Sequence, residues 1–505
     1  MPQPDRQTAA PPATPCNGRL AVAAIVLLAL GLRLAWLSIF DIQHPDEVLQ
    51  YLEMGHRLVT GEGYLTWEWR YGIRNSVIPQ LLAAPLALGH ALAPGTLAPV
   101  WLARLWFMAL TCLALPAAWR LGKPEGRAPA LVALVVVAVW WECVLYADLL
   151  LSESLSAALL LMAAALLLDP RASARALGLA GLVAGLAVIV RLQHAVFAIV
   201  LAAGALRGEW RRWRPVLGGG MAALALGALS DLATGQVPYA WALNNLALNI
   251  GAGRAAAFGT QGPLWYGVAL GEHLAPLAPA ILPLAWLAGR RTRPLFWAAT
   301  ANVVAHSLIG HKEYRFVWAS ALAWLVLAAI GSVRASEWAL RRRGRSEGLG
   351  LREIGLLALG WGAASLVSAA VTGGIPAYRG GGAVPQLALA AARDPGVCGI
   401  LVPGENRGFI GKVFLPRPVP LLLTPVGVDR VIPGAPISND LAAGANALIL
   451  PARPAGRPEY RRRACHEFWG GGPGEIGRLC LYVRPGPCAP TPGREFQQVQ
   501  YQADM

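Results

Sequence analysis

Charged residues are scarce in this 505-residue chain, making up 14% of it, whereas about 25% is usual for soluble proteins. Apolar residues make up 56%. This balance excludes a disordered chain, a coiled coil and an ordinary soluble enzyme. The apolar residues come in repeated blocks of about 18 to 25 with almost no charge, the length with which an α-helix crosses about 30 Å of hydrocarbon. The composition therefore predicts an α-helical polytopic membrane protein.

Nucleotide-binding and metal-binding motifs are also missing. The sequence has no P-loop and no Gly-x-Gly-x-x-Gly between a strand and a helix, which argues against a cytosolic sugar nucleotide as substrate. No Cys-x-x-Cys or His/Cys spacing suggests a metal site, so we expect neither a metal nor a cofactor. No internal repeat is visible, which argues against a transporter.

About eleven apolar stretches predict membrane-spanning helices. The first, 20–40, is too long for the apolar core of a signal peptide and no cleavage site follows it, so we interpret it as a retained signal anchor. We interpret 75–95 as an interfacial helix rather than a span. The remaining stretches are 97–119, 128–147, 154–168, 176–190, 193–206, 215–231, 264–288, 295–310, 316–333 and 353–373.

The net charge of +15 is interpreted as a topology signal. In a soluble chain it would suggest nucleic acid, but 20 of the 43 Lys and Arg residues fall in the N-terminal tail and in alternate loops between spans. The positive-inside rule places these segments in the cytoplasm. We therefore predict a cytoplasmic tail at 1–19, a transmembrane domain at 20–373, and no nucleic-acid partner. The odd number of spans puts the chain after 373 outside.

Composition changes at about residue 374, where Pro and Gly begin to punctuate short β-like runs. We predict a small mixed α/β domain over 374–505 on the outer side of the membrane. Four cysteines in an oxidising compartment suggest two disulfides, with three pairings open and buried free thiols as the alternative. These cysteines are Cys398, Cys465, Cys480 and Cys488.

The first outer loop, 41–96, holds the densest set of acidic and aromatic side chains in the sequence. This mixture suits sugar binding, because a sugar's C–H face stacks on an aromatic ring and its hydroxyl groups need charged acceptors. An interfacial aromatic belt explains Trp67 and Trp69 equally well. The candidate substrate-binding residues of this loop are His44, Thr66, Trp67, Glu68, Trp69 and Arg74.

Two adjacent carboxylates, Asp46 and Glu47, follow His44 where the first span leaves the membrane. Partial burial raises the basicity of a carboxylate, which suits a general base for a sugar hydroxyl group. Adjacent residues do not share a face, so only one of the two should be the base, while the other orients a neighbour or a substrate hydroxyl group. The first turn of a helix is an equally acceptable interpretation of this segment.

Three motifs in register resemble glycosyltransferase family 22, the polyprenyl-phosphate-mannose-dependent mannosyltransferases of GPI-anchor and N-glycan synthesis. The first combines His44-Pro-Asp-Glu47 with Gly61-Glu-Gly-Tyr-Leu-Thr-Trp-Glu-Trp69 and Gly72-Ile-Arg-Asn-Ser76. The second is Phe258-Gly-Thr260 with Trp265-Tyr266, and the third is His311-Lys-Glu-Tyr-Arg-Phe316. The resemblance covers roughly 19–333 and implies the GT-C fold.

What the resemblance implies is inverting transfer of mannose from a polyprenyl phosphate to a hydroxyl group of a glycolipid or glycan at the outer membrane face. It places the catalytic base at Asp46, with Glu47 as the alternative. High Ala, Gly and Arg content with only a few Lys suggests a GC-rich bacterial genome. We therefore expect an undecaprenyl- or decaprenyl-phosphate donor, a bacterial inner membrane and a site facing the periplasm.

A leaving phosphate needs cations rather than a general acid. Lys312 and Arg315, with His311 beside them, are the first candidates, followed by Arg191 and Arg254; snorkelling to lipid headgroups is the alternative. Arg33, within the first span, should pair with a carboxylate or phosphate or hydrogen-bond between helices. Further candidate substrate-binding residues are Asp148 and Glu153, a possible second acidic site or simply a short polar connection, together with Trp265, Tyr266 and Glu313.

Other functions remain open at this point. The same machinery using another polyprenyl-phosphate sugar, such as an arabinosyl or glucosyl donor, is the nearest alternative, because pocket shape sets sugar identity. A glycolipid flippase would show repeats and charges near mid-span, whereas the acids here cluster in an outer loop. A membrane scaffold whose outer domain recruits partners is the third interpretation.

Overall fold

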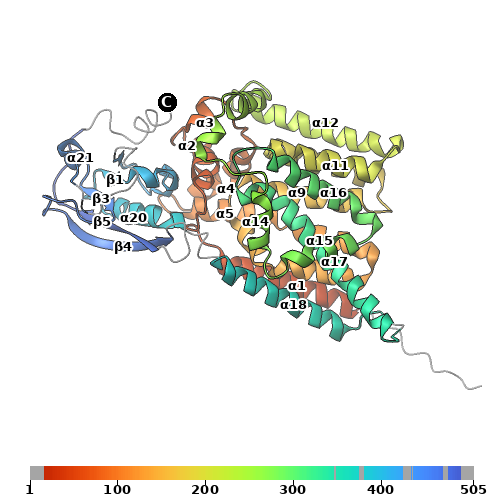
Figure 1. Ribbon diagram of the computed structural model, residues 1–505. Helices are drawn as coiled ribbons and strands as arrows, with labels where there is room; N and C mark the ends of the chain where they lie inside the picture. The colour runs from red at the N-terminus through yellow and green to blue at the C-terminus, as the bar shows by residue number, and fades with distance from the viewer. Residues whose placement is uncertain are drawn as a thin grey trace, which may run out of the picture.

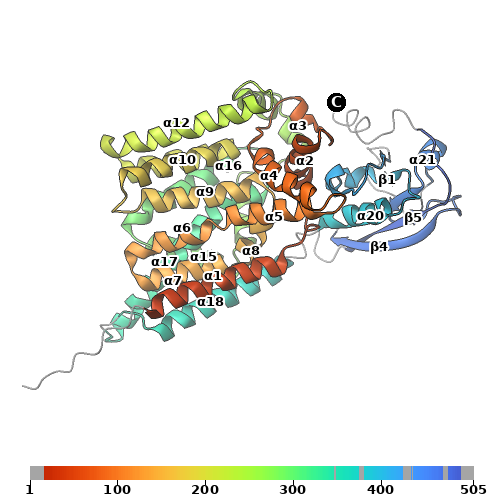
Figure 2. The same cartoon turned by 180° about the vertical axis from the view of Figure 1, so that it is seen from behind.

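The computed structural model describes residues 16–345, 348–374, 380–424, 434, 436–469 and 476–490. Residues 1–15 of the predicted tail 1–19 lie outside the described residues, and so do the residues of the predicted outer domain after 490. The molecule is elongated, with a bundle of roughly parallel helices that carries a sheet domain at one end (Figures 1 and 2).

A helix or a bent helix pair occupies each of the eleven predicted spans. Among the described residues, five helices are long and apolar enough to cross a membrane, and two bent pairs bring the number to seven. The helices of the bundle are α1 (Cys16–Trp36), α5 (Ala98–Thr111), α6 (Ala114–Gly122), α7 (Arg127–Val139), α8 (Trp141–Asp148), α9 (Ser152–Leu167), α10 (Ala174–Val190), α11 (Ala195–Leu206), α12 (Trp210–Ala233), α14 (Trp265–His273), α15 (Ala278–Leu287), α16 (Arg293–Ser307), α17 (Trp318–Arg342) and α18 (Leu351–Val371).

Helix α17 forms the core of the bundle. Small and large apolar residues cover all its sides, and 94% of its apolar window is buried, compared with 11% for α1 and 22% for α18. A helix that is apolar all round has no face to turn to water, so it takes the central place. The outer helices α1 and α18 leave most of their apolar surface exposed, as a lipid-facing helix does.

Arg33 of α1 bridges the break between α7 and α8, where the chain bends by 59° at Trp140. Such a break leaves carbonyl groups of the first helix without their usual partners. The Arg33 guanidinium donates to the carbonyl oxygens of Val137 (2.8 Å), Ala138 (3.1 Å) and Cys143 (3.0 Å). Of its two expected roles, the structure therefore shows hydrogen bonding between helices.

The first outer loop folds into short helices at the end of the bundle that faces the sheet domain (Figure 2). They are the π-helix η1 (Glu47–Leu52), α2 (Glu53–Thr60), α3 (Trp67–Arg70) and α4 (Val77–Leu92). Helix α4 corresponds to the stretch predicted as an interfacial helix. It packs closely on the start of α5, since a Cβ on its Gly89 would overlap the backbone of Pro99.

The sheet domain is mixed α/β and holds five strands in the order β2-β1-β3-β5-β4. Strand β1 runs parallel to β2 and β3, whereas β5 is antiparallel to β3 and β4. The domain begins beyond residues 375–379, which are outside the described ones. Its elements are α20 (Ala383–Ala392), β1 (Ile400–Val402), β2 (Leu421–Leu423), α21 (Asn439–Gly444), β3 (Ala447–Leu450), β4 (Arg461–Trp469) and β5 (Ile476–Val483).

Two disulfides are present in this domain, as predicted, and the structure selects one of the three pairings. Cys465 and Cys480 face each other across β4 and β5 and are bonded. Cys398, just before β1, is bonded to Cys488, which follows β5. The first bond therefore links β4 to β5, and the second links the segment after β5 to the segment before β1.

Candidate active site

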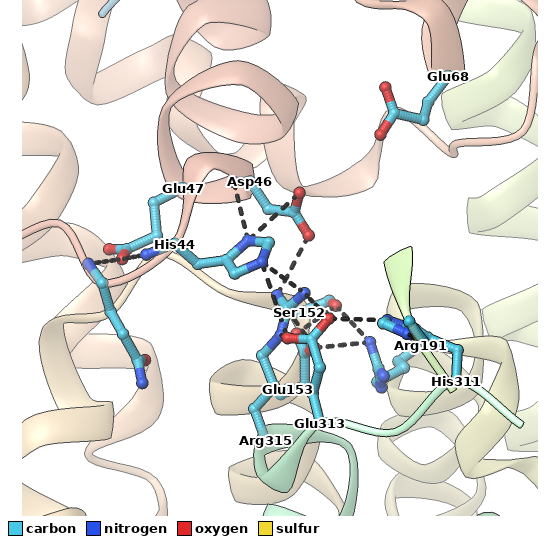
Figure 3. Close-up of polar contacts among 12 residues, drawn as sticks. His44, Asp46, Glu47, Glu68, Ser152, Glu153, Arg191, His311, Glu313 and Arg315 are labelled. Atoms are coloured by element: carbon cyan, nitrogen blue, oxygen red, sulfur yellow. Dashed lines mark hydrogen bonds and ion pairs between the residues drawn. The ribbon is translucent and has the colours of Figure 1, made fainter. Parts of the chain in front are cut away.

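Arg315 lies at the centre of a polar cluster where the first outer loop meets the bundle. It belongs to the 3-10 turn η7 (Tyr314–Val317) that leads into α17. Its Nη1 lies 3.1 Å from Asp46 Oδ2, its Nη2 lies 3.2 Å from His44 Nε2, and its Nε donates to Glu313 Oε2 at 2.7 Å. The HPDE and HKEYRF motifs, about 270 residues apart in sequence, therefore form one site (Figure 3).

A second arginine joins this cluster through Glu153, the second residue of α9. Glu153 Oε1 lies 2.9 Å from Arg191 Nη1 and 3.4 Å from Arg315 Nη1, so one carboxylate holds two guanidinium groups. Ser152 accepts from Arg191 at 3.3 Å and donates to Glu153 at 2.8 Å. The three ionised side chains are 1% to 8% exposed, and burial at this level requires such pairing.

Solvent reaches two acidic residues of the cluster, Asp46, with 17% of its side chain exposed, and Glu313, with 27%. Burial raises the pKa of the Asp46 carboxyl group, but His44, Arg315 and Arg74 outweigh this and hold the pKa well below its usual range. Arg74 Nη2 lies 4.0 Å from Asp46 Oδ2 and 3.9 Å from Glu68 Oε1. Asp46 is therefore ionised near neutral pH and surrounded by donors.

Glu47 points away from the cluster, into the protein (Figure 3). It is fully buried, and its Oε1 accepts from the backbone N–H groups of Gln43 (2.7 Å) and His44 (3.1 Å). Its Oε2 accepts from Leu150 N at 3.2 Å and lies 3.5 Å from Arg104 Nη2. Glu47 thus fixes the backbone before Asp46. Asp46 stands at the N-cap position of η1, yet its side chain makes no capping hydrogen bond.

His311 and Glu313 complete the cluster on the side of the HKEYRF segment. His311 Nε2 lies 3.1 Å from Glu313 Oε1, and this hydrogen bond raises the pKa of the imidazole. Burial raises the pKa of Glu313, but Arg315 and His311 lower it further, so the net shift is downward. Glu313 thus remains an anion that orients Arg315.

Several other predicted residues lie around this cluster and have contacts of their own. Lys312 donates to the carbonyl oxygens of Gln261 (3.0 Å) and Ile309, so its ammonium group braces a loop. Asp148 is buried at the end of α8, and its carbonyl oxygen accepts from Arg104 at 3.2 Å. The others are Arg254 in η5 (Arg254–Phe258), the edge-to-face pair Trp265 and Tyr266 at the start of α14, Thr66 before α3, and Trp67 and Trp69 within α3.

A polar pocket opens beside Asp46, between Arg74 and Arg191. Amide and hydroxyl side chains line it, a chemistry that matches sugar hydroxyl groups. Most of these residues carry no recognisable pattern in the sequence, because they come from five separate segments; of the polar lining residues, only Arg74 and Asn75 lie within a motif. The polar lining residues are Tyr51, Arg74, Asn75, Ser152, Arg191, Gln193 and Asn245.

Glu142 organises the side of η7 that faces the bundle, and the sequence analysis did not identify it. It is fully buried in α8, and its carboxylate lies 3.1 Å from the Tyr314 hydroxyl, 2.9 Å from His273 Nδ1 and 3.2 Å from Trp140 Nε1. Tyr314 directly precedes Arg315 and stacks on His273 with the ring centroids 3.5 Å apart. Glu142 therefore fixes the turn that presents Arg315.

Residues 22–372 match the model of the Alg9-like mannosyltransferase family. The chain is 31% identical over 302 residues to GPI mannosyltransferase 3 of Yarrowia lipolytica, covering 54% of this chain and 55% of that protein. It is 27% identical over 321 residues to GPI alpha-1,2-mannosyltransferase 3 of Mus musculus, covering 58% and 56%. The chain thus spans about half the length of the curated relatives it matches.

The solved structure of ArnT from Cupriavidus metallidurans bound to undecaprenyl phosphate is similar throughout, with a TM-score of 0.56 and 14% identity. The match covers 93% of this chain and 99% of ArnT. The apo form of ArnT matches with a TM-score of 0.55. At this identity the likeness shows the fold alone, and it confirms the predicted helical multispan membrane protein of GT-C type with a C-terminal mixed-sheet domain.

Proposed function

This chain belongs to the Alg9-like mannosyltransferase family, and we propose that it transfers mannose from a polyprenyl phosphate to a hydroxyl group of a glycolipid or glycan, with inversion at the anomeric carbon. The observation that carries the proposal is an ionised, partly accessible carboxylate, Asp46, that lies 3.1 Å from Arg315 and 4.0 Å from Arg74, and Arg74 lines the polar pocket. Undecaprenyl phosphate, bound in the similar ArnT structure, supports a lipid-phosphate donor.

In the proposed step, the acceptor oxygen forms a bond to the anomeric carbon while the bond from that carbon to the phosphate oxygen breaks. The electron pair leaves with the phosphate, and the acceptor proton passes to the Asp46 carboxylate. Arg74 and Arg191 face the pocket and are the cations for the departing phosphate. The acceptor attacks from the side of Asp46.

Glu47 takes no part in this proton transfer, because its carboxylate is buried against four partners on the far side of the backbone. Arg315 has a dual role. In the free protein it is bound to Asp46 and weakens it as a base, and an incoming phosphate competes for the same guanidinium. Donor binding therefore raises the basicity of Asp46 when the acceptor arrives.

The membrane topology in this proposal is the one that the arginine clusters predict. The site lies at the end of the bundle that carries the disulfide-bonded domain, so we place it on the periplasmic face of a bacterial inner membrane. The sugar is the part of the proposal that the pocket specifies least. Another polyprenyl-phosphate sugar is the alternative, because the same cations would accept any such phosphate.

The test is mannose transfer by the purified protein from polyprenyl-phosphate mannose, with a lipid extract of the host as acceptor pool. We expect Asp46→Asn to lower turnover by about 10²-fold or more, since general-base contributions are about 10² to 10⁴. Glu62→Gln, an exposed carboxylate of the same loop, is the matched control and should retain activity. Full activity in Asp46→Asn would refute the assignment of the base. A wild type that binds undecaprenyl phosphate but transfers no mannose would point to another donor sugar.

A further inference from the structure

The outer domain is joined to the catalytic loop through Glu53, the first residue of α2. This carboxylate is fully buried. Its Oε1 accepts from the N–H groups of Tyr64 (2.9 Å) and Lys412 (3.0 Å), and its Oε2 accepts from Val413 N at 3.1 Å. Lys412 and Val413 belong to the outer domain. A buried carboxylate is tolerated only with such partners, so Glu53 fastens two parts of the chain some 360 residues apart.

Glycines of the outer domain allow its backbone to lie directly on the loop. A Cβ on Gly411 would overlap the Glu53 carboxylate, and one on Gly408 would lie 2.6 Å from Pro45 Cβ. Gly381 N donates to Ile42 O at 3.0 Å. These contacts fall on both sides of His44 and Asp46 in the sequence.

We infer that the outer domain is a structural part of the active site, and that Glu53 is the positioning residue through which it acts. Arg315 reaches the site from the bundle, whereas Asp46 stands on a loop segment held between the bundle and the outer domain. The 3.1 Å contact between Asp46 and Arg315 therefore depends on both bodies. The activity arm of the test rests on the proposed function; the second arm does not.

Glu53→Gln tests the inference, because an amide has one acceptor oxygen where the carboxylate has two, and its NH₂ group opposes a backbone N–H. We expect kcat to fall about tenfold or more while KM for the lipid-phosphate donor changes less than about twofold. Glu62→Gln is the control, because Glu62 also pairs with Lys412, at 3.4 Å, but on the exposed surface. We expect it to keep wild-type kcat.

Hydrogen exchange followed by mass spectrometry gives a readout that needs no substrate. In Glu53→Gln, amides of 40–53 should exchange faster while the strands of the outer domain keep their protection. If Glu53→Gln does not fold, Gly411→Ala carries the same test with one added methyl group. Unchanged exchange in 40–53 together with wild-type kcat would overturn the inference. An inactive wild type would refute the proposed function and leave the exchange result standing.

An independent inference concerns the opposite end of the bundle, where α1, α6 and α7 enclose a groove of about 700 Å³. Its floor is apolar, with Val22, Val26 and Ala130, and its rim carries Arg19, Lys123 and Arg127 together with Trp119. None of its lining residues is acidic. The nearby Glu125 is already bound to Arg291 and Arg334.

The start of α7 adds to this positive charge. Gly126 caps the helix without a side chain, and Arg127 places a cation in the first turn, where the helix dipole is unfavourable for it. We propose that an anionic phospholipid fills the groove, its phosphate between the three cations and one acyl chain along α1. Its phosphate would also accept from the uncapped N–H groups of α7.

Native mass spectrometry of the delipidated protein tests this second inference. Phosphatidylglycerol should form adducts at least about fivefold more readily than phosphatidylcholine with the same chains. Arg19→Gln with Lys123→Gln and Arg127→Gln should abolish that preference, while the exposed pair Arg171→Gln and Arg175→Gln should keep it. Equal binding of the two lipids, retention of the preference in the triple variant, or displacement of phosphatidylglycerol by equimolar undecaprenyl phosphate would each overturn it.

Discussion

The two ends of the helical bundle place their arginines in opposite environments, buried at one end and exposed at the other. At the end facing the outer domain, Arg191 and Arg315 are 7% and 8% exposed and share the Glu153 carboxylate. At the other end, arginines such as Arg171 and Arg175 are exposed, and Arg19 and Arg127 line an open groove. Burying a cation costs far more free energy than leaving it exposed to water. The buried, paired arginines therefore mark the reaction site, whereas the exposed clusters mark how the chain is oriented in the membrane. Counting charges alone would not have separated the two groups.

The largest effect should come from Arg315→Lys. A lysine keeps the charge but cannot contact Asp46 and Glu313 together in the fork geometry of arginine. We expect mannose transfer to fall about 10²-fold, the scale for losing one preorganised donor. Initial-rate kinetics with polyprenyl-phosphate mannose would measure it. Arg290→Lys, an exposed arginine at the opposite end, should leave the rate unchanged; an equal loss in both variants would erase the contrast between the ends.

A smaller loss is expected for Glu142→Gln. Three groups converge on this carboxylate, and an amide leaves one of them without an acceptor, at a cost of about 1 to 3 kcal/mol. If half of that cost is felt at η7, turnover falls about two- to tenfold. Turnover and the thermal unfolding midpoint should be measured together. Normal turnover in a destabilised variant would show that Glu142 supports the bundle but not Arg315.

The smallest effect concerns the position of the acid limb of the pH profile, which is separate from the loss of rate expected when a phosphate-binding cation is removed. Arg74 is one of the cations that lower the pKa of Asp46, and a lowered pKa keeps the carboxylate ionised until the pH falls below it. In Arg74→Gln that pKa rises, so the acid limb of kcat/KM should move toward neutral pH by less than about one unit. Rates between pH 4 and pH 8 would show the shift. A limb that stays in place would mean that Asp46 is not the group that titrates.

The sequence predicted elements well where the signal was long and local. Apolar runs coincide with the helices of the bundle, the change of composition falls near the start of the sheet domain, and the motifs contain Asp46 and Arg315, which the structure brings into contact. It could not predict contacts made by single polar residues within apolar runs. Glu142, for example, meets Tyr314 from 172 residues away, and nothing near it in the chain marks it. Lys312 looked equivalent to Arg315 in the motif, but its ammonium group turns to carbonyl oxygens.

Three acceptors of the Arg33 guanidinium are synthesised well after Arg33 itself. Its acceptors beyond its own helix lie 104 to 110 residues later, in segments synthesised after α1 has entered the membrane. At about 5 to 20 residues per second, the ribosome needs about 5 to 20 s to supply them. During that interval the guanidinium, in the last turn of α1, has none of these three acceptors. We expect it to extend toward the headgroups at that end of the helix until the α7–α8 break is in place.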